Sequence, residues 1–162
     1  MTVLFRMARK RSKYGVDQTK EGIKKRTYNG VRYDSLAELQ FLWEVIEPKV
    51  KSGEIIKWER QVKFELQEGF TYKGKKVLPI NYIADYVIYW ANRKRTIIDV
   101  KGKIDATAKL KKKLFAYKYP DEDYVWVCRN IKYGDETHWI LYDDLEKIRK
   151  ENKKKNKEIK EK

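Results

Sequence analysis

Alternating and continuous apolar runs in the middle of the chain predict the long strands of a sheet. Residues 55–67 place Val62 and Phe64 between charged or polar neighbours, and this period of two is typical of a half-buried strand. Residues 77–90 form a second, longer β-rich run. Residues 91–95 are a polar loop, so we expect the chain to reverse there and the following segment to pair with this run.

Shorter runs predict further strands and two turns. Residues 96–102 (TIIDVKG) and 124–129 (YVWVCR) are mostly apolar or β-branched. The pair Asn29-Gly30 between β-prone residues favours a tight hairpin, and a second turn is expected around Gly74.

Two segments have the apolar period of helices, and a third helix is expected at the C-terminus. Residues 34–50 predict a helix with Ser35 as N-cap and Pro48 as its stop. Residues 106–119 predict a second helix, in which lysines occupy the faces away from an apolar stripe at Thr107, Leu110, Leu114 and Tyr117. From Trp139 onward, a short strand is expected to run into a final basic helix.

The predicted order is hairpin, helix, three strands, helix, strand, helix. This order indicates a mixed α/β domain in which helices pack on a central mixed sheet. The length of 162 residues suits one compact domain with tails. We expect a basic flexible arm at 1–26, the domain at 27–145 and a basic helix or tail at 146–162.

Composition excludes several classes of protein. One Cys and one His exclude Cys/His zinc fingers, disulfide scaffolds and two-His metalloproteases. We interpret His138 as structural, which also excludes nucleases that depend on histidine. No apolar run reaches the roughly 18 residues of a membrane span, and the N-terminus lacks a signal-peptide core. A cytoplasmic protein without a membrane partner is therefore expected.

The net charge of +15 is concentrated at both ends of the chain. Residues 1–26 carry nine basic and two acidic side chains, and residues 146–162 carry nine basic and four acidic ones. Clustered Lys and Arg indicate a polyanionic partner such as DNA, although a solubilising tail has the same composition. The candidate DNA contacts are Lys10, Arg11, Lys13, Lys24, Lys25, Arg26, Lys109, Lys111, Lys112 and Lys113.

Three acidic residues occur where the apolar pattern leaves no place for exposed charge. In the helix at 34–50, Glu38 falls on the apolar face and is expected to point toward the sheet. A structural role is the alternative, because Ser35 and Glu38 have the spacing of a capping box. Asp85 and Asp99 interrupt strands that are otherwise apolar, so each must be paired, hydrogen-bonded or metal-bound if buried.

A hairpin through residues 91–95 would bring these acids together with a lysine. Asp99 and Lys101 share one face of their strand. If Ala91 faces Arg95, then Asp85 lies opposite Lys101 and diagonal to Asp99. Two or three carboxylates can hold Mg²⁺, and a nearby lysine can orient a water molecule and stabilise charge on a phosphate. An Asp99–Lys101 ion pair between strands is the alternative, but it does not account for Asp85.

These segments together resemble the PD-(D/E)XK nuclease superfamily. The matching pieces are SLAELQF with Glu38, YIADYVIY with Asp85, and IIDVKG with Asp99 and Lys101, while Ala84 stands where the family name has Pro. The order and spacing are most similar to the endonuclease I type of Holliday-junction resolvase. The chain also resembles a phage-encoded family of uncharacterised proteins with KYG, FDS-x-x-E, PI-x-YIAD and DVKG blocks. The corresponding residues here are 13–15, 33–35, 79–82 and 99–102, with Tyr33 in place of the family's Phe.

The resemblance implies a restriction-endonuclease-like core in α-β-β-β-α-β order and an endonuclease that cuts DNA, including branched DNA. It implies a Mg²⁺ cofactor, replaceable by Mn²⁺, held by Asp85 and Asp99 with Glu38, and catalysis by these three residues and Lys101. It further implies a homodimer and a phage or prophage protein in a bacterial cytoplasm. A DNA-binding protein that retains the fold without catalysis is the alternative, and an exonuclease would use the same site.

Overall fold

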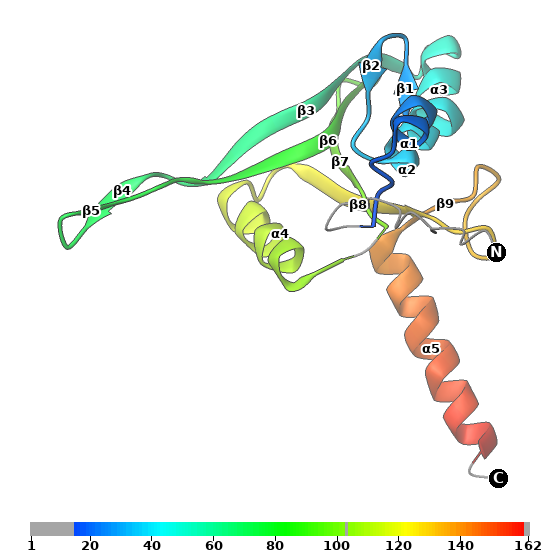
Figure 1. Ribbon diagram of the computed structural model, residues 1–162. Helices are drawn as coiled ribbons and strands as arrows, with labels where there is room; N and C mark the ends of the chain where they lie inside the picture. The colour runs from blue at the N-terminus through cyan, green and yellow to red at the C-terminus, as the bar shows by residue number, and fades with distance from the viewer. Residues whose placement is uncertain (1–14, 103, 161–162) are drawn as a thin grey trace, which may run out of the picture.

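A five-stranded mixed sheet forms the centre of the molecule in the computed structural model, which describes residues 15–102 and 104–160 (Figure 1). Its strand order is β3–β6–β7–β8–β9, and all neighbours are antiparallel except β7 and β8. The strands are β3 (Ile55–Gln67), β6 (Ile80–Trp90), β7 (Arg95–Val100), β8 (Asp123–Arg129) and β9 (Trp139–Leu141). The prediction of a mixed α/β domain with a central mixed sheet and helices is confirmed.

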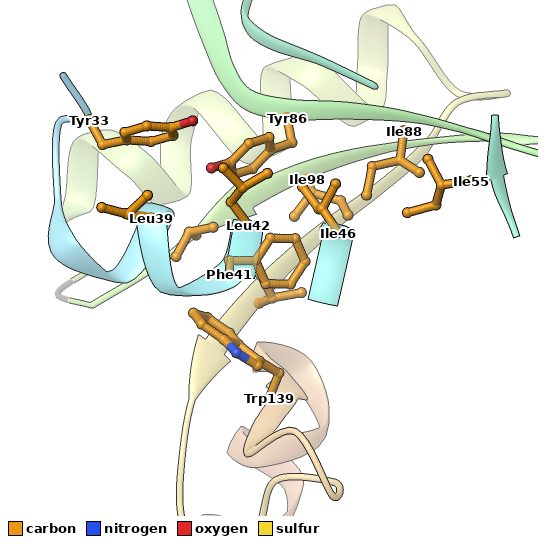
Figure 2. Packing of buried hydrophobic residues seen from close by; sticks show 12 residues of the cluster. Tyr33, Leu39, Phe41, Leu42, Ile46, Ile55, Tyr86, Ile88, Ile98 and Trp139 are labelled. Atoms are coloured by element: carbon orange, nitrogen blue, oxygen red, sulfur yellow. The ribbon is translucent and has the colours of Figure 1, made fainter. Parts of the chain in front are cut away.

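Helices cover both faces of this sheet. On one face, α2 (Leu36–Phe41) and the turn after it pack on β6 and β7, with the ring of Phe41 4.9 Å from that of Trp139 and 5.8 Å from that of Tyr86 (Figure 2). On the other face, Phe115 of α4 (Ala106–Lys118) enters an aromatic cluster. Helix α4 also provides the long crossover that the parallel strands β7 and β8 require.

The prediction that Pro48 ends the first helix is wrong. After α2, the chain continues through one π-helical segment, η1 (Leu42–Ile46), into α3 (Glu47–Lys51), and Pro48 lies in the first turn of α3. An α-helical Pro48 would lack the N–H for a bond to the preceding turn, and its ring would clash with that turn. The wider π-helical turn relieves this conflict, so the helical path runs on to Lys51.

The N-terminal segment is more ordered than its composition suggests. Helix α1 (Lys20–Lys25) precedes the hairpin of β1 (Thr27–Tyr28) and β2 (Val31–Arg32), whose Asn29-Gly30 turn was predicted. Arg26 is 2% exposed, and its guanidinium donates to the carbonyl oxygens of Tyr33 and Asp17 and to Oε1 of Gln18. The segment that was expected to be a flexible arm therefore contains, from Lys20 onward, a short helix and a buried arginine.

Helix α4 forms where it was predicted, but of its predicted apolar stripe only Leu114 packs against the buried cluster on this face of the sheet. The predicted apolar stripe includes Leu110 and Tyr117, which are 56% and 88% exposed, whereas Phe115 is fully buried. Phe115 is selected because its ring fits between those of Phe64, Tyr82 and Tyr124, at centroid distances of 5.2, 5.5 and 4.3 Å. Ring packing of Phe115 against aromatic residues of the sheet therefore decides which side of α4 is buried, and the apolar period of the helix does not.

Two elements project from the body of the domain. Beyond the sheet, β3 and β6 lead into a separate hairpin of β4 (Phe70–Tyr72) and β5 (Lys75–Val77), where only a turn was predicted (Figure 1). At the C-terminus, β9 runs directly into α5 (Tyr142–Lys160), as predicted. None of the helices in the described part of the chain has the length and apolar character that a bilayer crossing requires.

Candidate active site

Asp85 and Asp99 occupy facing positions at the point where the β6–β7 ladder ends. The ladder pairs Tyr86 with Ile98, so the next position along each strand is Asp85 and Asp99. At this point the Val100 N–H donates to Oδ2 of Asp85 at 2.8 Å. A side-chain oxygen of β6 thereby accepts a backbone hydrogen bond from β7, and this bond fixes the Asp85 carboxylate beside the end of β7.

The predicted register of this hairpin is wrong by two residues. The structure pairs Tyr89 with Arg95, and the Trp90 N–H donates to the Lys94 carbonyl oxygen at 2.9 Å. Arg95 therefore belongs to the strand, and the turn closes one step earlier, with Arg93 at a φ of +65°. A shift of two preserves the face of every side chain, so Asp85 faces Asp99 directly where Lys101 was expected.

An irregularity in the neighbouring strand accompanies Asp85. The β3–β6 ladder pairs Arg60 with Tyr86 and Val62 with Ala84 but omits the intervening position, where Gln61 has a φ of +53°. Positive φ is costly for a residue with a side chain, so Gln61 marks local strain opposite Asp85. Strain of this kind clusters at functional sites.

Asp99 and Lys101 form a close pair at the C-terminal end of β7. The Asp99 side chain is 4% exposed and that of Lys101 is 20% exposed, and Nζ lies 2.5 Å from Oδ2. The Lys101 N–H donates to the Val127 carbonyl oxygen, which holds its backbone on β8. The ammonium also lies 5.3 Å from the centroid of the Trp126 ring. Strand pairing and the indole ring together aim this ammonium at the carboxylates.

Glu38 points inward, as predicted, and it also takes part in the helix cap. It is 6% exposed, and its carboxylate accepts from the Ser35 hydroxyl at 2.8 Å and from the Asp34 N–H at 3.4 Å. The Glu38 N–H donates in turn to Ser35 Oγ. Tyr86 Oη donates to the Glu38 carbonyl oxygen at 2.9 Å, which ties this turn of α2 to β6. The cap that was considered as the alternative role of Glu38 is therefore present, and the Glu38 carboxylate accepts from the Ser35 hydroxyl in it.

Two of the buried carboxylates, those of Asp85 and Glu38, have raised pKa values. Burial raises the pKa of Asp85 well above its usual value, and the charges of Asp99 and Glu38 raise it further. Burial also raises the pKa of Glu38, against the opposing effect of its hydrogen bond from Ser35. Perturbed titration of clustered acids is typical of functional sites. A cation placed between Asp85 and Asp99 would relieve this repulsion.

The donor set of Asp85 and Asp99 fits a hard divalent cation. Asp99 Oδ2 is buried, and the Lys101 ammonium is its one ion-pair partner among the described residues. Mg²⁺ is commonly held by one or two carboxylates, with water and phosphate oxygens completing its shell. Within residues 15–102 and 104–160, no group of three or more His, Cys, Asp or Glu side chains is arranged to hold a metal. Glu38 therefore does not complete a three-carboxylate cluster.

The residues predicted to contact DNA differ in their exposure and in their partners within the protein. Lys10, Arg11 and Lys13 lie outside the described residues. The exposed members are Lys24, Lys25, Lys109 and Lys113. The half-buried Lys111 donates to the Asn81 carbonyl oxygen, and Lys112 pairs with Asp143 at 2.9 Å. Arg26 is buried and bonded within the N-terminal segment, so it is not available to a phosphate.

Two aromatic residues near the site carried no recognisable signal in the sequence. Trp126 on β8 is the register partner of Asp99 on β7. The ammonium groups of Lys101 and Lys112 lie 5.3 and 4.7 Å from the centroid of its ring. Tyr82 is buried with an unbonded hydroxyl, and burial followed by the Asp99 charge raises its pKa. Both residues look like ordinary aromatic positions of a strand. Pairing of β7 with β8 brings Trp126 to Asp99, whereas Tyr82 lies on the same strand as Asp85.

A family model described as a protein of unknown function (DUF1064) matches residues 18–135. The chain belongs to the DUF1064 family. The match spans α1 to the loop before β9, so Glu38, Asp85, Asp99 and Lys101 all lie inside the part that defines this family, and α5 lies outside it. No curated protein matches the chain.

Proposed function

We propose that this DUF1064 protein is a Mg²⁺-dependent endodeoxyribonuclease with a restriction-endonuclease-like core. The observation that carries the proposal is the convergence of Asp85, Asp99 and Lys101 at the end of the β6–β7 ladder. Two carboxylates with an ammonium beside them supply the groups that phosphodiester hydrolysis needs. The order of helix, three strands, helix and strand agrees with the nuclease core that the sequence resembles.

Each residue has a distinct role in this proposal. Asp85 and Asp99 would hold Mg²⁺ or Mn²⁺, which when bound supplies an acidified water and neutralises charge on the phosphate. The Lys101 ammonium would orient the attacking water and stabilise negative charge on a phosphate oxygen. Glu38 would act on the charge of Asp85 and on bound water, because its own oxygens are held by the cap.

The proposed substrate is DNA, including branched DNA, and the proposed active form is a homodimer. The net charge of +15 suits a polyanion, and the exposed lysines of α1 and α4 offer phosphate contacts. Two matched cuts at a junction are most simply made by two identical sites related by two-fold symmetry. The choice of branched DNA and the homodimer both rest on the resemblance to junction-resolving endonucleases.

A specific observation favours the alternative of a DNA-binding protein without catalysis. The described residues provide no three-carboxylate cluster, and Lys101 is paired with Asp99 as in an ordinary ion pair. Such a protein would bind DNA equally well with or without Mg²⁺. Cleavage separates the two functions.

The test is incubation of the protein and Mg²⁺ with linear duplex, single-stranded, flap and four-way-junction DNA. We expect cuts that require Mg²⁺ or Mn²⁺, stop with EDTA and disappear in the Asp99→Asn variant. Glu122→Gln is the matched control, because Glu122 pairs with Arg95 at the opposite end of β7. Binding without cleavage under all of these conditions would establish the alternative.

A further inference from the structure

The β4–β5 hairpin is a basic and aromatic projection. It belongs to a separate two-stranded sheet beyond β3 and β6 and lies away from the helices (Figure 1). Between Gly69 and Pro79 the sequence has three lysines and no acidic residue. The strands join through a tight turn at Lys73 and Gly74, with φ of +48° and +75°.

Large apolar side chains on this hairpin are exposed. Phe70 is 48% exposed, Tyr72 is 60% exposed and Leu78 is 69% exposed. Phe70 and Tyr72 alternate with Thr71, so they share one face of β4, and the register places Val77 and Lys75 opposite them. The Lys73 ammonium lies 5.4 Å from the centroid of the Tyr72 ring. One face of the hairpin thus presents two aromatic rings bordered by lysines.

This combination matches the chemistry of unpaired nucleotides. Proteins that bind single strands combine basic side chains along the backbone with aromatic rings on which bases stack. Bases inside a duplex do not offer their faces to such rings. We propose that the β4–β5 hairpin binds a single-stranded segment of DNA, which names the substrate class of the proposed nuclease and rests on that function.

The geometry relates this contact to the candidate active site. Strand β6 leads from the hairpin to Asp85, and at ~3.3 Å per residue the distance from Lys75 to Asp85 is at most ~33 Å. That distance is about one turn of duplex DNA. A substrate with a single-stranded branch would therefore be cut in its duplex part within about one helical turn of the branch.

The test measures binding by fluorescence anisotropy, in EDTA, to labelled oligo(dT) and to a blunt duplex. The aromatic variant is Phe70→Ser with Tyr72→Ser, and the charge variant is Lys73→Gln, Lys75→Gln and Lys76→Gln. The matched control removes three charges at the opposite end of β3 and β6, through Lys51→Gln, Arg93→Gln and Lys94→Gln. Tyr72→Ala alone replaces the aromatic pair if the double variant unfolds.

We expect the aromatic variant to lose about tenfold in affinity for oligo(dT), with little change for the duplex. The charge variant should reduce the dependence of log K on log salt by about 2, since each contact to a single strand contributes ~0.7. The control variant should keep the wild-type affinity for oligo(dT) and the wild-type dependence of log K on log salt. Unchanged oligo(dT) affinity in both hairpin variants, or equal losses for oligo(dT) and duplex, would overturn the inference.

The outcome for the hairpin is separable from that for nuclease activity. Asp99→Asn should bind oligo(dT) as the wild type does, because it leaves the hairpin intact. Hairpin-dependent binding without cleavage by the wild type would reject the nuclease and keep the single-strand site. Cleavage that is indifferent to the hairpin variants would reject the single-strand site and keep the nuclease.

Discussion

The two ends of β7 differ in how their charged side chains are balanced. At the N-terminal end, Arg95 pairs with Glu122 through two hydrogen bonds, and Thr96 donates to Asp123 at 2.7 Å. At the C-terminal end, Lys101 pairs with Asp99, while the nearby Asp85 is buried beside the charges of Asp99 and Glu38. Among the described residues, only Lys101 forms an ion pair with any of these three acids.

Burial increases the contrast between these ends. The Arg95 side chain is 42% exposed, whereas that of Asp99 is 4% exposed. An exposed pair contributes little to stability, and an unbalanced buried cluster reduces it. The proposed nuclease function would account for a fold that keeps such a cluster at the end of a strand. Substitutions of matched residues at the two ends of β7 test this difference.

The largest expected effect is on catalysis by Lys101→Met. Cleavage should fall by roughly 10²–10³, the scale for losing one preorganised electrostatic group, while DNA binding stays near normal. The variant should fold with a lower free energy of unfolding, because the buried Asp99 loses its ion-pair partner. Lys101→Arg should not restore activity, because a guanidinium differs in shape and does not give up its proton. Arg95→Met is the control and should cleave as the wild type does. Single-turnover cleavage at the wild-type rate in Lys101→Met would refute this role.

Asp85→Asn should stabilise the metal-free protein. The amide oxygen can still accept from the Val100 N–H, while the repulsion with Asp99 disappears. We expect the free energy of unfolding at pH 8 to rise by about 1 kcal/mol. Glu122→Gln should lower it by less than about 1 kcal/mol, because it breaks an exposed pair. Urea unfolding measures the free energy of unfolding of both variants. A lower value for Asp85→Asn than for the wild type would show that the negative charge of Asp85 is balanced by favourable contacts in the folded protein.

The stabilisation by Asp85→Asn should depend on pH. Because the folded pKa of Asp85 is raised, its contribution to stability is full below the unfolded value of about 3.9 and is lost as pH rises through the folded value. At low pH the protonated Asp85 is neutral, like the amide. The difference between variant and wild type should therefore shrink from pH 8 toward pH 4. A difference that is constant over this range would be inconsistent with a raised pKa.

Much of the fold follows from local sequence signals. The Asn29-Gly30 hairpin, the alternating strand β3 and the passage from β9 into α5 were all predicted, because each depends on turn chemistry or periodicity within a few residues. Pro48 was misjudged because its local preference is met by a π-helical turn. Arg26 was assigned to DNA because its burial depends on partners up to nine residues away.

The candidate site was predictable in its members but not in its geometry. Asp85, Asp99 and Lys101 interrupt apolar strands, which marked them and placed them on one face. The register depends on how many residues the turn absorbs, and both choices keep the same faces toward the core. Trp126 reaches the site through the pairing of β7 with β8, which no local pattern encodes, and Tyr82 on β6 looks like any aromatic strand residue in the sequence.

The smallest expected effects concern two tyrosine hydroxyls on β6. Tyr82 has a buried hydroxyl without a hydrogen bond, so Tyr82→Phe should leave stability unchanged or raise it by up to about 1 kcal/mol. Tyr89 donates to Glu59 at 2.7 Å toward the other end of the strand, so Tyr89→Phe should cost about 1 kcal/mol. Thermal unfolding compares the two. A larger loss of stability in Tyr82→Phe than in Tyr89→Phe would indicate that the Tyr82 hydroxyl forms a hydrogen bond in solution.

Metal binding tests most directly whether the C-terminal end of β7 is a functional centre. Isothermal titration calorimetry at pH 8 should show that the wild type and Glu122→Gln bind Mg²⁺ or Mn²⁺ with the same affinity. Asp99→Asn should bind at least about tenfold more weakly, because it replaces one of the two carboxylates proposed as metal ligands with a neutral amide. Equal affinity in all three proteins, or no binding to any of them, would contradict the assignment of Asp85 and Asp99 as metal ligands.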